Sequence, residues 1–293
     1  MPQHPTILEE TGTVATVLAT ACLQLAQILK SDKSIARLEA RVLASHAWNV
    51  TSSWLIAHDT DVLTSQQRTQ FQALLERRLN GEPIAYITGE REFYGRSFVV
   101  TPAVLIPRPE TELLVDVVLA QIPLHQPIDI LELGTGSGCI ALSLALERPH
   151  ARVTAVEQDA GALSMAQMNA LNLGAHVEFL KSDWFSALAN RKFDFIVSNP
   201  PYVPSNDPHL RRGDVQFEPL CALVSGMKGI DDLAHIINQA PAFLKTQGSV
   251  YLEHGYDQSR AITDLLSKAG YTSIRSWLDL SGITRVTRGK LSK

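Results

Sequence analysis

The sequence predicts an α/β fold: a Rossmann-like, mostly parallel sheet with helices on both faces, preceded by a small all-helical domain. From Pro127 onward, segments typical of strands and of helices alternate along the chain, as they do in a doubly wound parallel sheet. The first of these strands ends in a glycine-rich turn. Before residue 90 the apolar side chains recur mainly at helical spacing. Ligands of such a sheet bind outside the carboxyl ends of its strands.

The helical part is defined by periodicity and by its end signals. Apolar residues recur at helical spacing over residues 14–29 and again over residues 35–46. Thr64 and Gln67 have the spacing of a capping box, which opens a further helix. Asn80-Gly81 is expected to end that helix.

Three regions follow from these patterns: a helical domain over residues 1–89, a connector over residues 90–109 and an α/β catalytic domain over residues 110–293. Aromatic and β-branched residues around Gly95 predict that the connector is a β-hairpin. Pro109-Glu110-Thr111-Glu112 then opens a helix, because acidic residues favour a helix N-terminus. Seven strands are expected, at residues 128–133, 152–157, 177–180, 193–197, 249–253, 273–278 and 284–287.

Composition narrows the class of protein. The 293 residues include 26 Lys and Arg against 30 Asp and Glu, so the net charge of −4 argues against stable nucleic-acid binding through a broad basic face. Three separated cysteines without a Cys/His cluster predict no disulfide framework and no metal. Gln24 and Gln27 interrupt the first apolar stretch, so no membrane span is expected. We expect a cytoplasmic monomer.

A cofactor loop follows the first strand. Its residues are Gly134, Thr135, Gly136, Ser137 and Gly138. Glycines let a ligand approach the backbone, and the amides at the following helix N-terminus can bind an anionic group. Glu157 ends the second strand about twenty residues on, where an acid accepts from ribose hydroxyls. The pattern is that of a nucleoside cofactor site. It leaves NAD and S-adenosylmethionine open, with a tight turn that binds nothing as the third reading.

Asp183 and Trp184 follow the third strand and are candidates for contact with an adenine ring. The carboxylate of Asp183 could accept from the exocyclic amine, and the Trp184 indole offers a flat face. The alternative is that Trp184 is a core residue. We favour the adenine contact because the position is again the carboxyl end of a strand.

The chemistry is predicted from Asn199-Pro200-Pro201-Tyr202, which follows the fourth strand. The prolines stiffen the loop and remove two backbone donors. The Asn199 side-chain oxygen and the Pro200 carbonyl could accept from the two N–H groups of an amide and stabilise charge developing on its nitrogen. Tyr202 could pack on the planar group. Such a loop suits transfer of a methyl group to a planar nitrogen, with much of the catalysis due to orientation. A simple strand-ending turn is the alternative.

The motif [N/D/S]PP[Y/F/W] is typical of methyltransferases that act on adenine, guanine or glutamine nitrogens, and the chain resembles the peptide chain release factor glutamine methyltransferases. The resemblance runs from about Gly81 to the C-terminus, with a weaker match in the helices before it. The segments that carry it are residues 81–89, 106–112, 131–138, 182–185, 199–202, 217–219, 252–255 and 285–287.

This resemblance implies a class I S-adenosylmethionine-dependent methyltransferase with a seven-stranded sheet. It implies that the cofactor contacts residues 134–138, Glu157, Trp184 and Asn199, and that S-adenosylhomocysteine is the product. Residues 199–202 would hold the glutamine of the Gly-Gly-Gln loop of class 1 release factors, the protein partner. The helical domain would help to dock that factor. Glu157 and Glu132 depart from the family, which more often has Asp at both positions.

Three alternatives remain on the sequence. The nearest is a methyltransferase for a ribosomal-protein glutamine, which shares the tetrapeptide. More distant are a nucleic-acid base methyltransferase, which would need a basic groove, and a NAD-dependent or purely binding Rossmann module, which the fold alone permits. Arg108 and Glu110 are further candidates for the methionine end of the cofactor. His254, beside a strand end, is expected to be structural.

Overall fold

The computed structural model describes residues 12–292 and divides the chain into two compact units. The first consists of Met1–Gly89 together with His209–Phe217, and the second of Glu90–Pro208 together with Glu218–Lys293. The second unit starts at Glu90 and includes the segment 90–109 that the sequence set apart as a connector. The participation of residues 209–217 in the first unit has no counterpart in the sequence pattern.

The first unit is built on five helices. Their bounds are α1 (Val14–Ile28), α2 (Lys33–Trp48), α3 (Ser52–Ala57), α4 (Ser65–Leu79) and α5 (Ile84–Thr88). Thr64 and Gln67 form the predicted capping box, in which each side chain satisfies a backbone N–H of the other. Apolar side chains from all five helices, with Phe71 and Leu75 fully buried, make one core. None of the helices among residues 12–292 is long and apolar enough to cross a membrane.

Arg78, on α4, ties the segment 209–217 to these helices. Its guanidinium is 9% exposed and donates two hydrogen bonds to Glu39, at 3.0 and 2.8 Å. It also donates to Asp214, at 2.8 Å, and to the Glu82 carbonyl, at 3.1 Å. A buried guanidinium is tolerated when its donors are satisfied in this way. The segment is therefore linked to the helices through an ion pair between the buried Arg78 and the partly exposed Asp214.

The second unit begins with the predicted hairpin, in which β1 (Glu90–Phe93) pairs antiparallel with β2 (Arg96–Val99). Tyr94 and Gly95 form its turn, both with positive φ. The Glu112 carboxylate accepts from the Tyr94 N–H at 2.7 Å, which connects the turn to the helix that follows. That helix consists of a 3₁₀ turn, η1 (Pro109–Thr111), continued by α6 (Glu112–Leu119).

A seven-stranded sheet forms the centre of the second unit, in the order β5-β4-β3-β6-β7-β9-β8. The first five strands of this order are parallel, and β9 runs antiparallel to both of its neighbours. The strands are β3 (Asp129–Leu133), β4 (Arg152–Glu157), β5 (Glu178–Lys181), β6 (Phe193–Ser198), β7 (Leu244–Glu253), β8 (Tyr271–Leu278) and β9 (Thr284–Leu291). All seven predicted strands are present.

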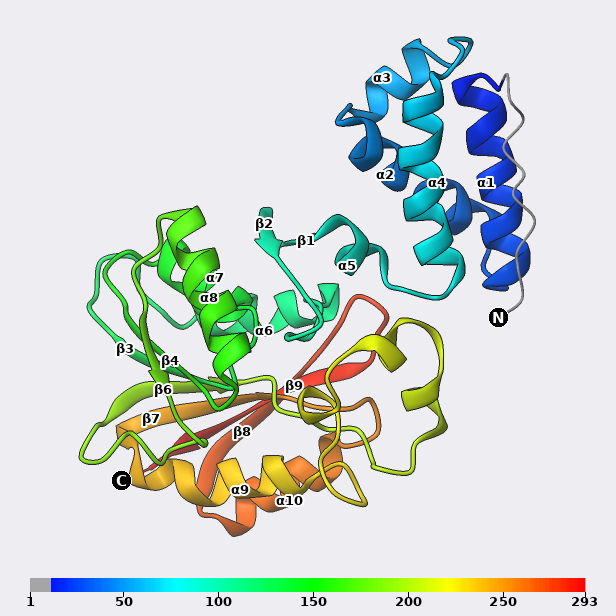
Figure 1. Ribbon diagram of the computed structural model, residues 1–293. Helices are drawn as coiled ribbons and strands as arrows, with labels where there is room; N and C mark the ends of the chain where they lie inside the picture. Colours follow the sequence, from blue (N-terminus) through cyan, green and yellow to red (C-terminus); the bar gives the residue numbers. More distant parts are fainter. Residues whose placement is uncertain (1–11, 293) are drawn as a thin grey trace. The chain divides into compact units, whose positions relative to one another are not determined.

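Helices cover both faces of this sheet (Figure 1). On one face lie α6, α7 (Cys139–Glu147) and α8 (Ala160–Leu173), and on the other lie α9 (Asp231–Gln239) and α10 (Ser259–Lys268). Each face has its own buried apolar cluster. Because β3 and β6 adjoin while their helices lie on opposite faces, the strand order reverses between them. Such a switch point opens a crevice at the carboxyl ends of the strands.

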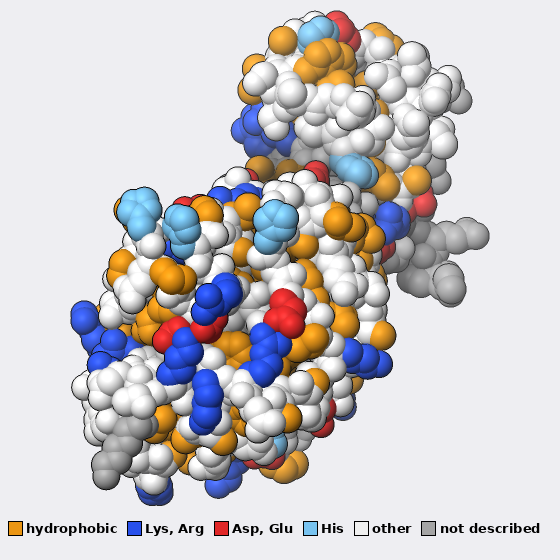
Figure 2. Space-filling model, turned by 90° about the vertical axis from the view of Figure 1, so that its left-hand side faces the viewer, with side chains coloured by type: hydrophobic (Ala, Val, Ile, Leu, Met, Phe, Trp, Pro, Cys, Tyr) orange, Lys and Arg blue, Asp and Glu red, His pale blue; other side chains and the backbone are white. Residues whose placement is uncertain are grey.

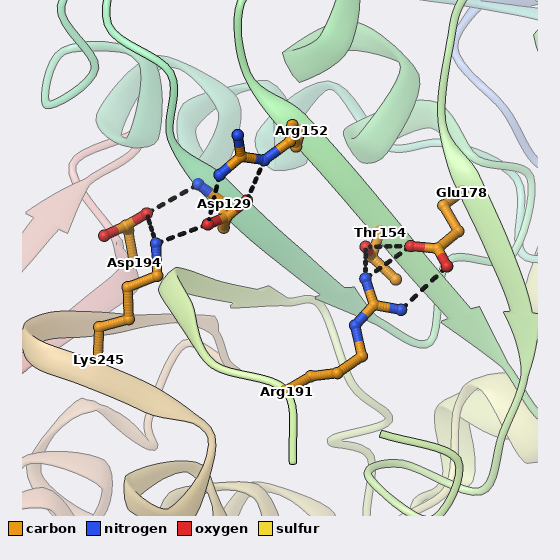
Figure 3. A network of polar contacts seen from close by, with 7 residues as sticks. All are labelled: Asp129, Arg152, Thr154, Glu178, Arg191, Asp194 and Lys245. Carbon is orange, nitrogen blue, oxygen red and sulfur yellow. Dashed lines mark hydrogen bonds and ion pairs between the residues drawn. The ribbon is translucent and has the colours of Figure 1, made fainter. Parts of the chain in front are cut away.

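The amino ends of the parallel strands are joined by two ionic networks (Figure 3). Lys245 bridges Asp129 and Asp194, at 2.6 and 2.7 Å, and Arg152 also binds Asp129. Arg191 pairs with Glu178 at 2.6 Å in the second network. A hollow of about 1070 Å³ lies at this edge, lined by Arg152, Arg191 and apolar side chains. Its arginines are already neutralised by carboxylates, and Figure 2 shows positive and negative side chains close together on one face of the molecule.

Candidate active site

A smaller cavity of about 430 Å³ lies at the opposite, carboxyl-terminal edge of the same strands. Its size is within the range of pockets for small organic ligands. The loops after β3, β4, β5 and β6 line it, together with residues 103–111 and 219–222. It brings together the predicted site residues Gly134, Thr135, Gly136, Ser137, Glu157, Trp184, Asn199 and Pro201.

The glycine loop needs its glycines for two different reasons. Gly134, Gly136 and Gly138 have φ values of 70°, 54° and 85°, a left-handed conformation that strains other residues. A Cβ on Gly138 would lie 3.0 Å from Leu142 and 3.2 Å from Ala166, so this glycine permits close packing of α7 against α8. Around Gly136 no atom lies within 4 Å of the Cβ position. That open space leaves the backbone accessible from the cavity.

Glu157 holds the loop from the end of β4. One of its oxygens accepts from the Gly136 N–H at 2.9 Å, and the other accepts from the N–H groups of Gln158 and Asp159 at 2.8 and 3.0 Å. A carboxylate offers about four lone-pair positions, so roughly one remains for a hydroxyl of a ligand. The sequence had predicted acceptance from both ribose hydroxyls. In the structure the Glu157 carboxylate also fixes the glycine loop, through its hydrogen bond with the Gly136 N–H.

Glu132 is a cavity residue that the sequence analysis did not include among its site residues. Its side chain is 1% exposed, and one oxygen accepts from the Thr135 hydroxyl and from the Ala141 N–H. The other oxygen has no hydrogen-bond partner among residues 12–292. Burial raises the pKa of this carboxyl to about 8. A buried, unpaired oxygen beside a cavity is suited to a cationic ligand group. In the sequence, the signal that could have identified Glu132 as a cavity residue was its position two residues before the first glycine of the loop.

The loop after β5 contributes Trp184, which lines the cavity, and Asp183, which does not. Trp184 is half-buried, and its ring faces Gly134, whose Cβ position lies 3.6 Å from it. The indole also packs against the apolar cluster beneath α9 and α10, as the core interpretation expects, while its contact with adenine stays a prediction. The Asp183 side chain is exposed, and its contact with adenine stays a prediction.

Asn199 begins the tetrapeptide at the carboxyl end of β6. Its side-chain Nδ2 donates to the Thr111 hydroxyl oxygen at 3.2 Å. Within residues 12–292 no donor is bonded to its Oδ1 or to the backbone carbonyl of Pro200. Both proposed acceptors therefore lack a donor, but Pro200 is buried and, unlike Asn199, does not line the cavity, so its contact with a substrate stays a prediction.

Tyr202 is anchored at both its ring and its backbone. The ring packs against the apolar cluster beneath α9 and α10, and the hydroxyl donates to Glu253 at 3.4 Å. Burial raises the pKa of the phenol above its usual range, so it stays a proton donor. The Gln258 amide donates to the Tyr202 carbonyl at 2.9 Å. Tyr202 is not among the residues that line the cavity, so its contact with a substrate also stays a prediction.

Arg108 lines the cavity and is fixed by Glu218, whose carboxylate is fully buried. Glu218 accepts from the Arg108 guanidinium and from the Ile106 N–H, the latter at 3.1 Å. Glu110, by contrast, is exposed and does not line the cavity. His254 is fully buried, with its ring nitrogens bonded to the Gly255 carbonyl and to the Thr287 hydroxyl, at 2.9 and 2.8 Å. This is the structural role expected for it.

Within the described part of the chain, no group of three or more His, Cys, Asp or Glu side chains is placed to hold a metal ion. The three cysteines are free thiols. The polar side chains of the cavity include carboxylates, hydroxyls, the Arg108 guanidinium and the Asn199 amide.

Known proteins share both units. Residues 17–89 match the family model described as the PrmC N-terminal domain, and residues 109–211 match the methyltransferase small domain. The chain is 46% identical to the release factor glutamine methyltransferase of Bordetella pertussis over 264 residues, 90% of this chain and 98% of the relative. It is also 46% identical to that of Escherichia coli over 255 residues, 87% of this chain and 92% of the relative.

A solved structure supports the fold. The 16S rRNA N2 G1207 methyltransferase of T. thermophilus, in complex with AdoMet and guanosine, superimposes with a TM-score of 0.51 at 21% identity. The match covers 69% of this chain and 49% of that one. At this identity it bears on the fold alone, and the methyltransferase fold expected from the sequence is confirmed. Taken with the near full-length matches, these likenesses show that the chain belongs to the release factor glutamine methyltransferases.

Proposed function

We propose that this protein transfers a methyl group from S-adenosylmethionine to the side-chain amide nitrogen of the glutamine in the Gly-Gly-Gln loop of class 1 release factors. The observation that carries the proposal is a pair of acceptors without a donor, Asn199 Oδ1 and the Pro200 carbonyl, in the loop whose first residue, Asn199, lines the strand-end cavity beside the glycine loop. Their number matches the two N–H groups of a primary amide. The full-length relatives named for release factors favour that substrate.

The cavity residues fit this cofactor. Glu132, with a buried oxygen that lacks a partner, would take the ammonium of its methionine part. Glu157 would accept from a ribose hydroxyl, and Trp184 would lie against the adenine. When bound, S-adenosylmethionine supplies an electrophilic methyl group on a sulfonium, and S-adenosylhomocysteine remains after transfer.

The residues of the tetrapeptide would orient and polarise the substrate amide by hydrogen bonding, and none of them would act as a base that removes its proton. An amide nitrogen is a weak nucleophile because its lone pair is delocalised, and no side-chain base can remove its proton. Asn199 and Pro200 would bind the two N–H groups and favour pyramidalisation by stabilising the positive charge that grows on nitrogen. Held in this way, the amide nitrogen would accept the methyl group that the cofactor gives up, and the methylated nitrogen would then lose one proton to water. Orientation provides the rest of the acceleration.

The test is methylation of purified release factor with labelled S-adenosylmethionine, with ribosomal proteins and DNA offered in parallel. Label on the peptide that contains Gly-Gly-Gln supports the proposal, and label only on another substrate refutes it. Asn199→Ala should lower kcat by about 10²–10³-fold, as loss of one transition-state hydrogen bond does elsewhere, with cofactor affinity largely kept. Asn172→Ala, on the exposed side of α8, is the matched control.

A further inference from the structure

A buried acid, Glu253, lies beneath the tetrapeptide and has no part in the function proposed above. It ends β7, whose neighbour β6 leads into the tetrapeptide. Ser198 pairs with Leu252, so Glu253 and Asn199 are the next residues on adjacent parallel strands. The Glu253 side chain is 2% exposed, and its Oε2 atom has no hydrogen-bond partner in the described part of the chain. A buried carboxyl with an unpaired oxygen lowers the stability of the fold, so its presence at this position suggests a role in positioning neighbouring side chains.

Two side chains, Tyr202 and Thr111, border this carboxyl, and a third, Asn199, is linked to it through Thr111. Tyr202 donates its hydroxyl proton to Oε1 at 3.4 Å. The Thr111 hydroxyl borders the same carboxylate and stabilises its charged form. On its other side, Thr111 Oγ1 accepts from Asn199 Nδ2 at 3.2 Å. Thr111 is itself 2% exposed, so water does not compete for these contacts.

The direction of these bonds decides which way the Asn199 amide points. A threonine hydroxyl has a single proton and can accept with its lone pairs. When that proton is donated to Glu253, the Thr111 oxygen can only accept, so it must be met by the NH₂ end of Asn199. The carbonyl end of Asn199 is then directed away from Thr111. A flipped amide would place two acceptors against each other.

We propose that Glu253 and Thr111 are positioning residues that set the orientation of the Asn199 amide and hold the Tyr202 phenol. This inference rests on the proposed function, because it assumes that Asn199 Oδ1 receives an N–H of the substrate amide. Glu253 does not line the cavity, whereas Thr111 does. Their effect on the substrate passes through the hydrogen bonds to Asn199 and Tyr202.

The arrangement depends on the charge of Glu253. Burial raises the pKa of this carboxyl to about 7, with Thr111, Arg285 and Tyr202 acting against the rise and Glu110 acting with it. Above that pH the carboxylate accepts from both hydroxyls. Below it, the carboxyl carries its own proton, which competes for the Thr111 oxygen and loosens the hold on Asn199. At saturating substrates kcat should therefore rise with pH through about 7.

The first test needs no turnover. In protein labelled with ¹⁵N-asparagine, the side-chain NH₂ signal of Asn199 is assigned by its loss in Asn199→Ala. Thr111→Val should shift that signal, and Glu253→Gln should shift it as well although Glu253 is not bonded to Asn199. Thr111→Ser, which keeps the hydroxyl, should restore the wild-type signal. If the Asn199 signal did not shift in Glu253→Gln, the positioning role of Glu253 would be refuted.

The kinetic test uses the same variants. Thr111→Val and Glu253→Gln should each lower kcat roughly 10- to 100-fold, the range seen when a group that orients a site residue is removed, with the cofactor Kd within about twofold of wild type. Glu253→Gln should also lose the rise of kcat through pH 7. Thr263→Val, on α10, is the control for a lost threonine hydroxyl. Wild-type kcat in Thr111→Val would refute the positioning role. A wild-type protein that methylates no release factor would instead refute the proposed function, and the NMR result would still stand.

Discussion

Cofactor binding is expected to release a proton from Glu132. In the free protein, burial holds the pKa of this carboxyl at about 8, so at pH 7 roughly nine-tenths of the molecules carry the neutral acid. An ammonium group beside the unpaired oxygen would favour the carboxylate and lower its pKa. Binding at pH 7 should thus release up to about 0.9 proton per site, and the apparent Kd should fall roughly tenfold between pH 6 and pH 7. In this range an α-amino group stays mostly protonated.

Isothermal titration calorimetry measures this release directly. Titrations of S-adenosylmethionine in phosphate and in Tris, whose ionisation enthalpies differ, give the number of protons from the difference in observed heat. Glu132→Gln should bind more weakly and release no proton, with a Kd that is flat between pH 6 and pH 7.5. Glu157→Gln, the other cavity acid, should weaken binding and leave the release intact. A wild-type release below about 0.2 proton at pH 7 would refute the reasoning.

Three further outcomes concern stability. Gly138→Ala should lower the free energy of unfolding in urea by about 1–3 kcal/mol more than Gly136→Ala does, because only the Gly138 Cβ meets Leu142 and Ala166. Arg78→Met should destabilise the first unit by about 3 kcal/mol, since it leaves the Glu39 carboxylate largely buried without a partner; fluorescence in urea would report it. The cofactor-free protein should lose stability as pH rises from about 5 to 8, because the unfolded Glu132 ionises near 4.5 and the folded one near 8. Glu132→Gln should flatten the dependence of Tm on pH.

Local signals in the sequence located most of the fold and the outline of the site. The capping box at Thr64, the hairpin turn at Gly95 and the loop Gly134–Gly138 each depend on residues close together in the chain. The sequence did not predict the links between Arg78 and Asp214, 136 residues apart, or between Ile106 and Glu218, 112 apart. Such contacts depend on tertiary packing, which no local pattern encodes.

The same limit applied to the buried acids. Glu132 lies next to the glycine motif in the sequence. Only its burial and its unpaired oxygen, both visible in the structure, identify it as a candidate ligand for a cationic group. Glu253 resembled an ordinary strand end until its contact with Tyr202 was located. Asp183 is the opposite case. It follows the end of a strand, where a cofactor ligand is expected, but its side chain is exposed, and its contact with adenine stays a prediction.

The segment His209–Phe217 makes the helical unit discontinuous in the gene although it is continuous in space. A fragment that ends at Gly89 would lack this segment, and Arg78 would lose the carboxylate of Asp214. Exchange of the helical unit between two relatives would succeed only if this segment, encoded beyond the tetrapeptide, travelled with it. Substitutions on α4 and in residues 209–217 should accordingly occur together among relatives, although residues 80–208 lie between them in the chain.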